Sequence, residues 1–367
     1  MVAVTLMAEV ATKFRLPLVA LFEKLVAPHP IDRYLELIDP LLTVRDLRGV
    51  VTAVHRATSD AVTLTVRPTS QWAGFEAGQF VRIGVVIRGI RETRCYSPVN
   101  SQHRADGQIE LTVHARGAVS NFLVKNACAG MVFSLAAAAG EFRLPDQRPQ
   151  RIVFISGGSG VTPVMSMLRT LIDENYPGDI VFLHYARTSA DAVYRDELAW
   201  VGELENVTVR IVYTDQTGVA ELYGNFVPDH LDTMTSGDAP ALTYLCGPQG
   251  LMDSVRDLYQ ARGLGAQLRT EAFTAAPMFV PGGTEGNTSF VLAGISVPNS
   301  SVSLLEQAEM AGLKPEFGCR MGICFSCTAM KATGSTRNLR TGDVDTRADQ
   351  PIQLCVSAAV GDVTINL

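Results

Sequence analysis

The chain has 367 residues, which exceeds what one hydrophobic core usually covers, so two or three domains are expected. Hydrophobic residues make up 47% of the sequence and charged residues 19%, a balance that excludes an intrinsically disordered protein. The net charge of −6 argues against a nucleic-acid-binding protein.

The first 43 residues are expected to form a helical extension, because apolar residues recur at helical spacing between residues 18 and 26. Glu9, Lys13 and Arg15 interrupt the apolar core that a secretory signal needs. No stretch approaches the ~18 uninterrupted apolar residues of a transmembrane helix. A cytoplasmic protein is therefore expected.

Residues 44–147 are expected to form a small antiparallel β-barrel. Short alternating segments, such as residues 62–66 and 109–113, are separated by Gly, Pro and Asn. The segment Arg94-Cys95-Tyr96-Ser97-Pro98 interrupts this pattern. It offers a guanidinium, an aromatic face and a hydroxyl, although taken alone it is most simply a loop.

Residues 148–274 are expected to form a doubly wound parallel sheet, because apolar runs alternate with helix-like stretches. The expected strands are residues 152–155, 180–183, 207–212 and 242–245, and the expected helices are residues 164–174, 195–204 and 248–262.

A glycine-rich turn follows the first of these strands, in Gly157-Gly158-Ser159-Gly160-Val161-Thr162-Pro163. Glycines let a backbone approach a pyrophosphate, and the new helix directs free N–H groups at the anion. Pro163 replaces the usual third glycine, so this is not the ordinary dinucleotide fingerprint. A plain tight turn is the alternative. A second loop, Cys246-Gly247-Pro248, follows the last strand, where ligands of open α/β sheets bind.

Residues 275–287 are rich in Pro and Gly and are expected to be a linker, and a C-terminal domain follows at residues 288–367. There Cys319, Cys324 and Cys327 have the C-x4-C-x2-C spacing of a plant-type [2Fe–2S] cluster, with Cys355 as the fourth ligand. A tetrahedral zinc site and a redox-active C-x-x-C pair are the alternatives.

Four motifs, taken in chain order, resemble those of the ferredoxin–NADP reductase superfamily. They are R-x-Y-S at residues 94–97, Gly117-Ala118-Val119-Ser120, GGSGVTP and CGPQGLM. With a plant-type ferredoxin domain of the β-grasp fold behind them, they resemble the single-chain reductases of oxygenases and desaturases. Residues 30–42 are similar to the reductase partners of membrane-bound acyl-CoA (stearoyl-CoA) desaturases.

The resemblance implies a flavin site in the barrel. Arg94 would contact the flavin phosphates, Tyr96 would pack on the isoalloxazine ring, and Ser97 would hydrogen-bond near N5. Gly117 and Ser120 would bind the pyrophosphate. The implied site also includes Pro98, His114 and Val119.

The resemblance also implies a nicotinamide site. Cys246 and Gly247 would lie near the nicotinamide ring, and Glu271 and Phe273 would form an acidic and aromatic pair beside the flavin. Ser97, Cys246 and Glu271 are the candidate catalytic residues, although no general acid or base is assigned. The nucleotide itself would be held by Gly157, Gly158, Gly160 and Thr162.

Arg187 and Arg195 favour NADPH over NADH, because arginine accommodates the 2′-phosphate at the end of the second strand. Solvated surface charges are the alternative. FAD is favoured over FMN by the resemblance. Phe325 departs from the family, since many relatives have a glycine at that place in the cluster loop.

The expected function is electron transfer from NADPH through FAD and a [2Fe–2S] cluster to a protein acceptor. The resemblance favours a membrane di-iron fatty acyl-CoA desaturase, beside which the chain would be peripheral to the membrane. Two alternatives are the reductase of a ring-hydroxylating or other oxygenase, and an electron-transfer subunit of an oligomeric dehydrogenase.

Overall fold

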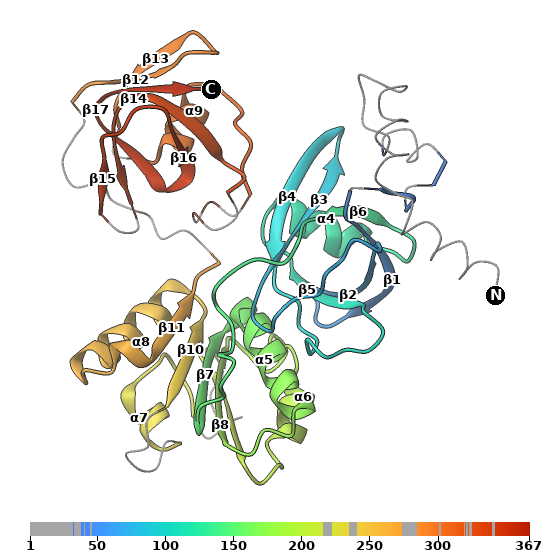
Figure 1. Ribbon diagram of the computed structural model, residues 1–367. Coiled ribbons are helices and arrows are strands. Elements are labelled where there is room, and N and C mark those ends of the chain that lie inside the picture. Colours follow the sequence, from blue (N-terminus) through green and yellow to red (C-terminus); the bar gives the residue numbers. More distant parts are fainter. Residues whose placement is uncertain are drawn as a thin grey trace.

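The computed structural model contains three β-sheets in chain order (Figure 1). It describes residues 32, 38, 39, 41–44, 46–215, 222–234, 241–273, 285–300, 302–318, 320, 322, 325–339 and 342–367. Most of the expected N-terminal helical extension and most of the expected linker lie outside these residues.

The first sheet is antiparallel and has six strands in the order β4-β3-β6-β1-β2-β5. It forms a half-barrel around a core of alternating apolar side chains, among them Leu64, Ile83 and Leu111. Helix α4 (Ala118–Asn126), which the sequence pattern did not predict, packs Val119 and Leu123 into this core. The strands are β1 (Arg48–Arg56), β2 (Ala61–Pro68), β3 (Val81–Ile87), β4 (Ile90–Tyr96), β5 (Ile109–His114) and β6 (Val132–Leu135).

The second sheet is the expected parallel sheet, with five strands in the order β11-β10-β7-β8-β9. The strands are β7 (Arg151–Gly157), β8 (Asp179–Ala186), β9 (Val207–Tyr213), β10 (Leu242–Cys246) and β11 (Leu268–Glu271). The helices are α5 (Val161–Asp173), α6 (Arg195–Val201), α7 (Pro228–Asp232) and α8 (Gln249–Ala261), with 3-10 turns at Gly158–Gly160 and Gly265–Gln267.

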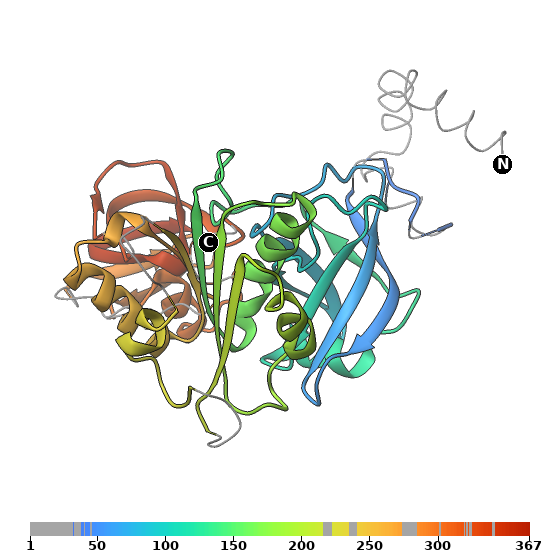
Figure 2. The ribbon, with the colours of Figure 1, turned by 90° about the horizontal axis from the view of Figure 1, so that it is seen from below.

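Successive side chains of β7 pack on opposite faces of this sheet, which explains its continuous apolar sequence. Ile152 and Phe154 contact the core beneath α5 and α6, whereas Val153 and Ile155 contact the core beneath α7 and α8. Figure 2 shows α5 and α6 on the side of the parallel sheet that faces the half-barrel, with α8 on the other side.

The third sheet is built from residues 287–366 in the order β13-β12-β17-β14-β15, with β16 also paired to β14. Strands β12 and β17 are parallel and the other pairs are antiparallel. Helix α9 (Leu304–Met310) begins with a capping box between Ser303 and Glu306 and covers the core. The strands are β12 (Asn287–Phe290), β13 (Ile295–Pro298), β14 (Thr328–Asn338), β15 (Val344–Asp345), β16 (Gln350–Gln353) and β17 (Ser357–Asn366), and Leu354–Val356 form a 3-10 turn.

Arg169 of α5 fixes the parallel sheet against the half-barrel. Its guanidinium donates two 2.7 Å hydrogen bonds to the carboxylate of Glu197, one of 2.9 Å to the carbonyl of Val99 and one of 3.3 Å to the carboxylate of Glu110. Glu110 belongs to β5, so a half-buried ion-pair network crosses between the two sheets and holds their shared boundary in one geometry.

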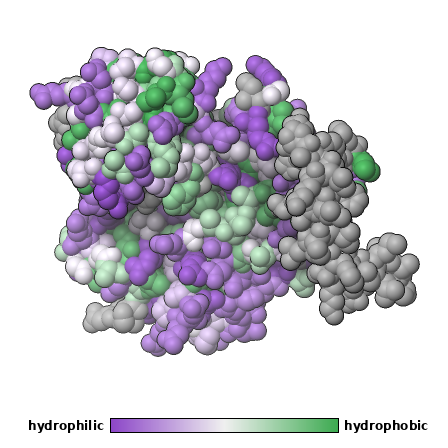
Figure 3. Space-filling model, turned by 45° about the horizontal axis from the view of Figure 1, so that its top comes forward, coloured by the Kyte–Doolittle hydropathy of each residue, from purple (hydrophilic) through white to green (hydrophobic). Residues whose placement is uncertain are grey.

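On the face shown in Figure 3, apolar side chains gather on the C-terminal part, at the upper left. Large exposed apolar residues there include Leu292, Met310 and Phe325. Within the described part of the chain, none of the helices is both long and apolar enough to cross a lipid bilayer.

Candidate functional site

Two glycine-containing turns meet at the carboxyl end of the parallel sheet. A Cβ on Gly160 would lie 2.1 Å from the carbonyl oxygen of Cys246, and one on Gly157 would lie 2.7 Å from the ring of Pro248. Gly158 has a φ of +53°, which disfavours a larger residue. The turns after β7 and β10 therefore form one surface, and glycine is required for their close approach.

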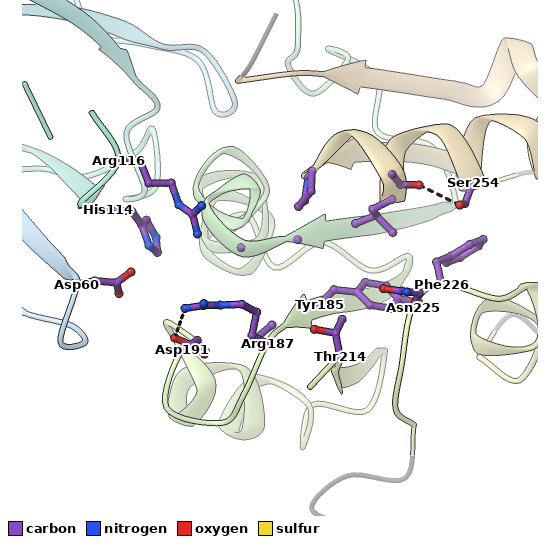
Figure 4. Close-up of a pocket in the computed structure, with 16 residues that line it drawn as sticks. Asp60, His114, Arg116, Tyr185, Arg187, Asp191, Thr214, Asn225, Phe226 and Ser254 are labelled. Carbon is purple, nitrogen blue, oxygen red and sulfur yellow. Dashed lines mark hydrogen bonds and ion pairs between the residues drawn. The ribbon is translucent and has the colours of Figure 1, made fainter. Parts of the chain in front are cut away.

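A cavity of about 520 Å³ opens beside this surface (Figure 4). We call it the inter-sheet cavity, because residues of the half-barrel and of the parallel sheet line it together. Asp60, His114 and Arg116 come from the half-barrel, and Gly157, Gly158 and Arg187 from the parallel sheet. The remaining lining residues are Tyr185, Ala186, Asp191, Thr214, Asn225, Phe226, Pro248, Gly250, Leu251 and Ser254.

The structure separates the two arginines that we expected at one phosphate. Arg187 lines the cavity and forms a 3.0 Å ion pair with Asp191, which also accepts a 2.7 Å hydrogen bond from Thr188. Arg195 does not line the cavity, and its guanidinium pairs with its neighbour Asp196 at 3.0 Å.

Arg116 lines the cavity in place of Arg195, and Figure 4 shows its side chain directed toward the centre from the half-barrel side. The sequence analysis missed this residue. Its position directly before Gly117-Ala118-Val119-Ser120 was the signal that could have identified it.

One hydrogen bond joins the two motifs of the half-barrel, R-x-Y-S at residues 94–97 and the segment at residues 117–120. Tyr96 ends strand β4, and its hydroxyl lies 2.8 Å from the hydroxyl of Ser120 in α4. Burial raises the pKa of Tyr96 to about 12, so the phenol stays protonated. Gly117 precedes α4 with a φ of +99° and open space around it, which leaves the first N–H groups of the helix accessible to an anion.

The segment at residues 94–98 differs from its predicted form. Arg94, Cys95 and Tyr96 continue strand β4, so they do not interrupt the sheet, and the strand ends before Ser97. Pro98 forms an isolated bridge to Leu111 of β5, which fixes the turn that holds Ser97.

Three predicted cofactor residues have buried polar atoms without a hydrogen-bond partner in the part of the chain that the structure describes. They are Ser97 Oγ, His114 Nε2 and Glu271 Oε2. Buried polar atoms are rarely left unpaired, so a bound group is the simplest partner for them. Burial lowers the pKa of His114 and raises that of Glu271 to about 8. The residues present therefore fit a polar cofactor.

Glu271 lies opposite Cys246 in the parallel pairing of β10 with β11, at the edge of the glycine surface. Burial, followed by the charge of Glu271, raises the pKa of the Cys246 thiol well above its usual range. Phe273 follows two residues later and is 38% exposed, so its ring is accessible to a ligand. Thr162, in contrast, is buried in the first turn of α5 and donates to the carbonyl of Ser159 at 3.2 Å.

Two of the four predicted metal-binding cysteines are described, and both are buried. The backbone N–H of Cys355 donates a 3.4 Å hydrogen bond to the sulfur of Cys327. The backbone N–H of Gly322 donates one of 3.2 Å to the sulfur of Cys355. Such N–H groups stabilise thiolates around a metal centre. Cys319 and Cys324 lie outside the described residues.

We call residues 317–327 the cysteine loop, and three of its described residues contact the half-barrel. Thr93 donates a 3.1 Å hydrogen bond to the carbonyl of Phe317, and Arg94 donates one of 3.3 Å to the carbonyl of Gly318. Arg82 of β3 donates to the hydroxyl of Ser326. The predicted cluster loop is thus attached to the two strands, β3 and β4, that lead into the R-x-Y-S motif.

Comparison with protein families gives two matches. The model described as oxidoreductase FAD-binding domain matches residues 50–144, and the one described as oxidoreductase NAD-binding domain matches residues 154–257. These matches confirm the expected FAD-binding and nicotinamide-nucleotide-binding parts of the chain.

Similar proteins extend the comparison to nearly the whole chain. The NADPH oxidoreductase of Mycobacterium tuberculosis is 36% identical over 354 residues, covering 94% of this chain and 90% of that protein. The glycine betaine monooxygenase reductase subunit of Pseudomonas aeruginosa is 28% identical over 328 residues. The alignment covers 80% of this chain and 87% of that protein. The solved structure of phthalate dioxygenase reductase aligns with a TM-score of 0.58 at 22% identity, over 88% of this chain and 98% of that one, and shows a shared fold.

Proposed function

Because the chain belongs to the ferredoxin–NADP reductase superfamily of FAD- and NAD(P)-binding oxidoreductases, we propose that it is an electron-transfer reductase that uses NADPH and serves a protein acceptor. The observation that carries this proposal is the attachment of the cysteine loop to strands β3 and β4, beside the flavin motif. A reductase acting only on small molecules would not need that loop.

The residues that would hold FAD lie on the half-barrel. Arg94 and the helix N-terminus at Gly117 would bind its phosphates, Tyr96 would pack against the ring system, and the unpaired hydroxyl of Ser97 would hydrogen-bond to it. When bound, FAD accepts hydride from a nicotinamide and releases electrons one at a time, and a [2Fe–2S] cluster transfers them singly.

The residues that would hold the nucleotide line the inter-sheet cavity and its glycine surface. Gly157, Gly158 and Gly160 would admit the pyrophosphate, and Arg187 would receive the 2′-phosphate after leaving Asp191. Cys246 would lie near the nicotinamide ring and Glu271 beside the flavin, and both side chains, uncharged near neutral pH, would exclude water from the site.

We propose Cys319, Cys324, Cys327 and Cys355 as the ligands of a [2Fe–2S] cluster, with residues 288–367 as a β-grasp ferredoxin domain. The buried sulfurs of Cys327 and Cys355, each facing a backbone N–H, support this assignment. We keep the division into 44–147, 148–274 and 288–367 as the domain proposal.

For the acceptor we propose a membrane-bound di-iron acyl-CoA desaturase, which rests on the resemblance of residues 30–42. A second candidate acceptor is the oxygenase component of a monooxygenase or ring-hydroxylating system. Relatives named as reductase subunits of glycine betaine monooxygenase and propane 2-monooxygenase favour it.

The proposed function is tested by anaerobic stopped-flow reduction of the purified protein with NADPH and, separately, with NADH. We expect loss of flavin absorbance followed by loss of cluster absorbance, with NADPH faster. The Cys355→Ser variant should keep the first phase and lose the second together with its iron. Cys128→Ser, at an exposed cysteine, is the control. Zinc in place of iron, with a single flavin phase in the wild type, would refute the electron relay.

The acceptor is tested by reconstitution. The reduced protein is mixed in turn with a membrane desaturase and with an oxygenase component, and substrate turnover is measured. Turnover with the desaturase alone supports our first assignment, whereas turnover with the oxygenase alone replaces it with the second.

A further inference from the structure

The ring of Phe317 contacts two arginines, Arg94 of strand β4 and Arg320 of its own loop. The guanidinium carbon of Arg320 is 3.8 Å from the centroid of the Phe317 ring, and that of Arg94 is 5.5 Å from it. Both distances are within the ~6 Å over which a cation is attracted to an aromatic face. The ring is therefore a shared contact between the cysteine loop and strand β4.

Arg320 is fixed from the opposite side by helix α9. Its two terminal nitrogens pair with the two carboxylate oxygens of Glu309, one of them at 3.0 Å. The backbone of Arg320 has a φ of 58°, which is unfavourable for a residue with a side chain. The ion pair and the ring contact together offset this cost, and they hold the arginine over Phe317.

Arg94 uses only part of its hydrogen-bonding capacity for the cysteine loop. Its Nη1 donates to the carbonyl of Thr93 at 3.0 Å and to that of Gly318 at 3.3 Å. Within the described part of the chain, Nε and Nη2 donate to no residue. Since a guanidinium has five N–H donors in a rigid fork, Arg94 can hold the loop and bind an anion at the same time.

We propose that Phe317, held by Arg320 and Glu309, positions Arg94 for the flavin phosphates, so that FAD binding and docking of the cysteine loop stabilise each other. This inference rests on the proposed function, which assigns Arg94 to the flavin site. Coupling between two binding events is reciprocal, so docking of the loop must raise FAD affinity by the same factor by which FAD favours docking. Phe317 is thus a positioning residue, although it lies more than 200 residues after the flavin motif.

The test is the FAD dissociation constant of the full-length apoprotein, followed by the quenching of flavin fluorescence. Phe317→Leu keeps an apolar side chain but removes the aromatic face, and we expect it to raise the dissociation constant roughly 3- to 10-fold. Phe317→Tyr restores an aromatic face and should bind FAD within about twofold of the wild type. If Phe317 served only to fill apolar space, Phe317→Leu would bind FAD as tightly as the wild type.

Matched controls come from the same part of the chain. Phe325→Leu changes a phenylalanine of the same loop that is 68% exposed, and it should leave FAD affinity unchanged. Glu309→Gln weakens the anchor of Arg320 and should act in the direction of Phe317→Leu, whereas Glu316→Gln, at an exposed carboxylate, should not.

The outcomes separate this inference from the proposed function. Wild-type FAD affinity in Phe317→Leu, or equal losses in the leucine and tyrosine variants, would overturn the positioning role. An unchanged affinity in Arg94→Ala would instead refute the assignment of Arg94 to the flavin.

Hydrogen exchange gives an independent readout of the same coupling. In the wild type, FAD should slow exchange of the amides at residues 317–320, and in Phe317→Leu this effect of FAD should be lost. An equal effect of FAD in both proteins would contradict the coupling.

Discussion

Cys246 and Glu271 lie directly opposite each other on neighbouring parallel strands, at the carboxyl edge where the glycine-rich turns meet. Both side chains are buried, and burial raises the pKa of each of them, that of Glu271 to about 8. The pair therefore presents an uncharged thiol and an uncharged carboxyl group near neutral pH. Such a pair can border a nicotinamide ring without attracting water into the site.

The raised pKa of Glu271 predicts how the stability of the apoprotein depends on pH. Between the unfolded value of 4.5 and the folded value of about 8, the folded state binds more protons than the unfolded state. The free energy of unfolding must therefore fall as the pH rises through this window, by on the order of a few kcal/mol.

Thermal unfolding from about pH 5 to about pH 9 measures this dependence. Glu271→Gln, which cannot ionise, should have a flatter profile and a higher midpoint than the wild type at the alkaline end. Glu316→Gln, at an exposed carboxylate, is the control and should follow the wild type. Parallel profiles for the wild type and Glu271→Gln would show that Glu271 is not the cause.

Ser97 is expected to contribute to catalysis and not to stability. Its hydroxyl is buried and has no partner among the described residues, so Ser97→Ala removes no hydrogen bond from the apoprotein. The thermal midpoint of the apoprotein should be unchanged or slightly higher. The rate of flavin reduction by NADPH should fall roughly 10- to 100-fold, because a hydrogen bond to the flavin is lost. A wild-type rate of flavin reduction in the Ser97→Ala variant, measured by stopped flow, would show that Ser97 does not contribute to the flavin site.

Arg187 is expected to determine the preference for NADPH. Arg187→Ala should lower kcat/KM for NADPH roughly 10- to 100-fold, since charge-assisted hydrogen bonds to a phosphate are lost, and should change kcat/KM for NADH much less. Arg195→Ala is the matched control, because Arg195 lies outside the inter-sheet cavity and pairs with its neighbour Asp196. Equal losses with both nucleotides would mean that Arg187 binds a group that they share.

Four of the five strands of the parallel sheet, β7 to β10, were predictable because each contains a mainly apolar run, whereas β11 (Leu268–Glu271) has one apolar residue and was not predicted. Residues 152–155 and 180–183 were expected, and β7 and β8 include them with a few added residues at each end. Helix α4 was not predicted. Its nine residues follow a glycine within a region of alternating strands, and its stability comes from packing Val119 and Leu123 into the half-barrel.

The candidate site was predictable only where its residues adjoin one another in the sequence. Arg195 is near Arg187 along the chain but does not line the cavity, whereas Arg116, which lines it, follows strand β5 of the half-barrel. The contacts of Phe317 with Arg94 and Arg320 likewise join distant segments. Such pairs depend on how the sheets pack against each other, which no local pattern of residue types encodes.

Phe325 has a φ of 56°, a left-handed backbone conformation that suits glycine better than phenylalanine. Phe325→Gly should therefore relieve about 1 kcal/mol of backbone strain and raise the unfolding midpoint of the C-terminal sheet. The ring is 68% exposed, so little buried apolar area is lost with it. Removing the ring should also admit water to the cysteine loop. Because water stabilises the more highly charged reduced form of a thiolate-bound cluster, we expect a higher reduction potential for the proposed [2Fe–2S] cluster.

A redox titration followed by electron paramagnetic resonance measures the potential, and calorimetry measures the midpoint. Asn175→Gly is the matched control, because Asn175 has a φ of 50° but lies in the turn between helix α5 and strand β8. It should increase stability in its own part of the fold and leave the potential unchanged. If Phe325→Gly increased stability without changing the reduction potential, the Phe325 ring would not shield the cysteine loop from water. Its effect would then be limited to the backbone conformation of the turn.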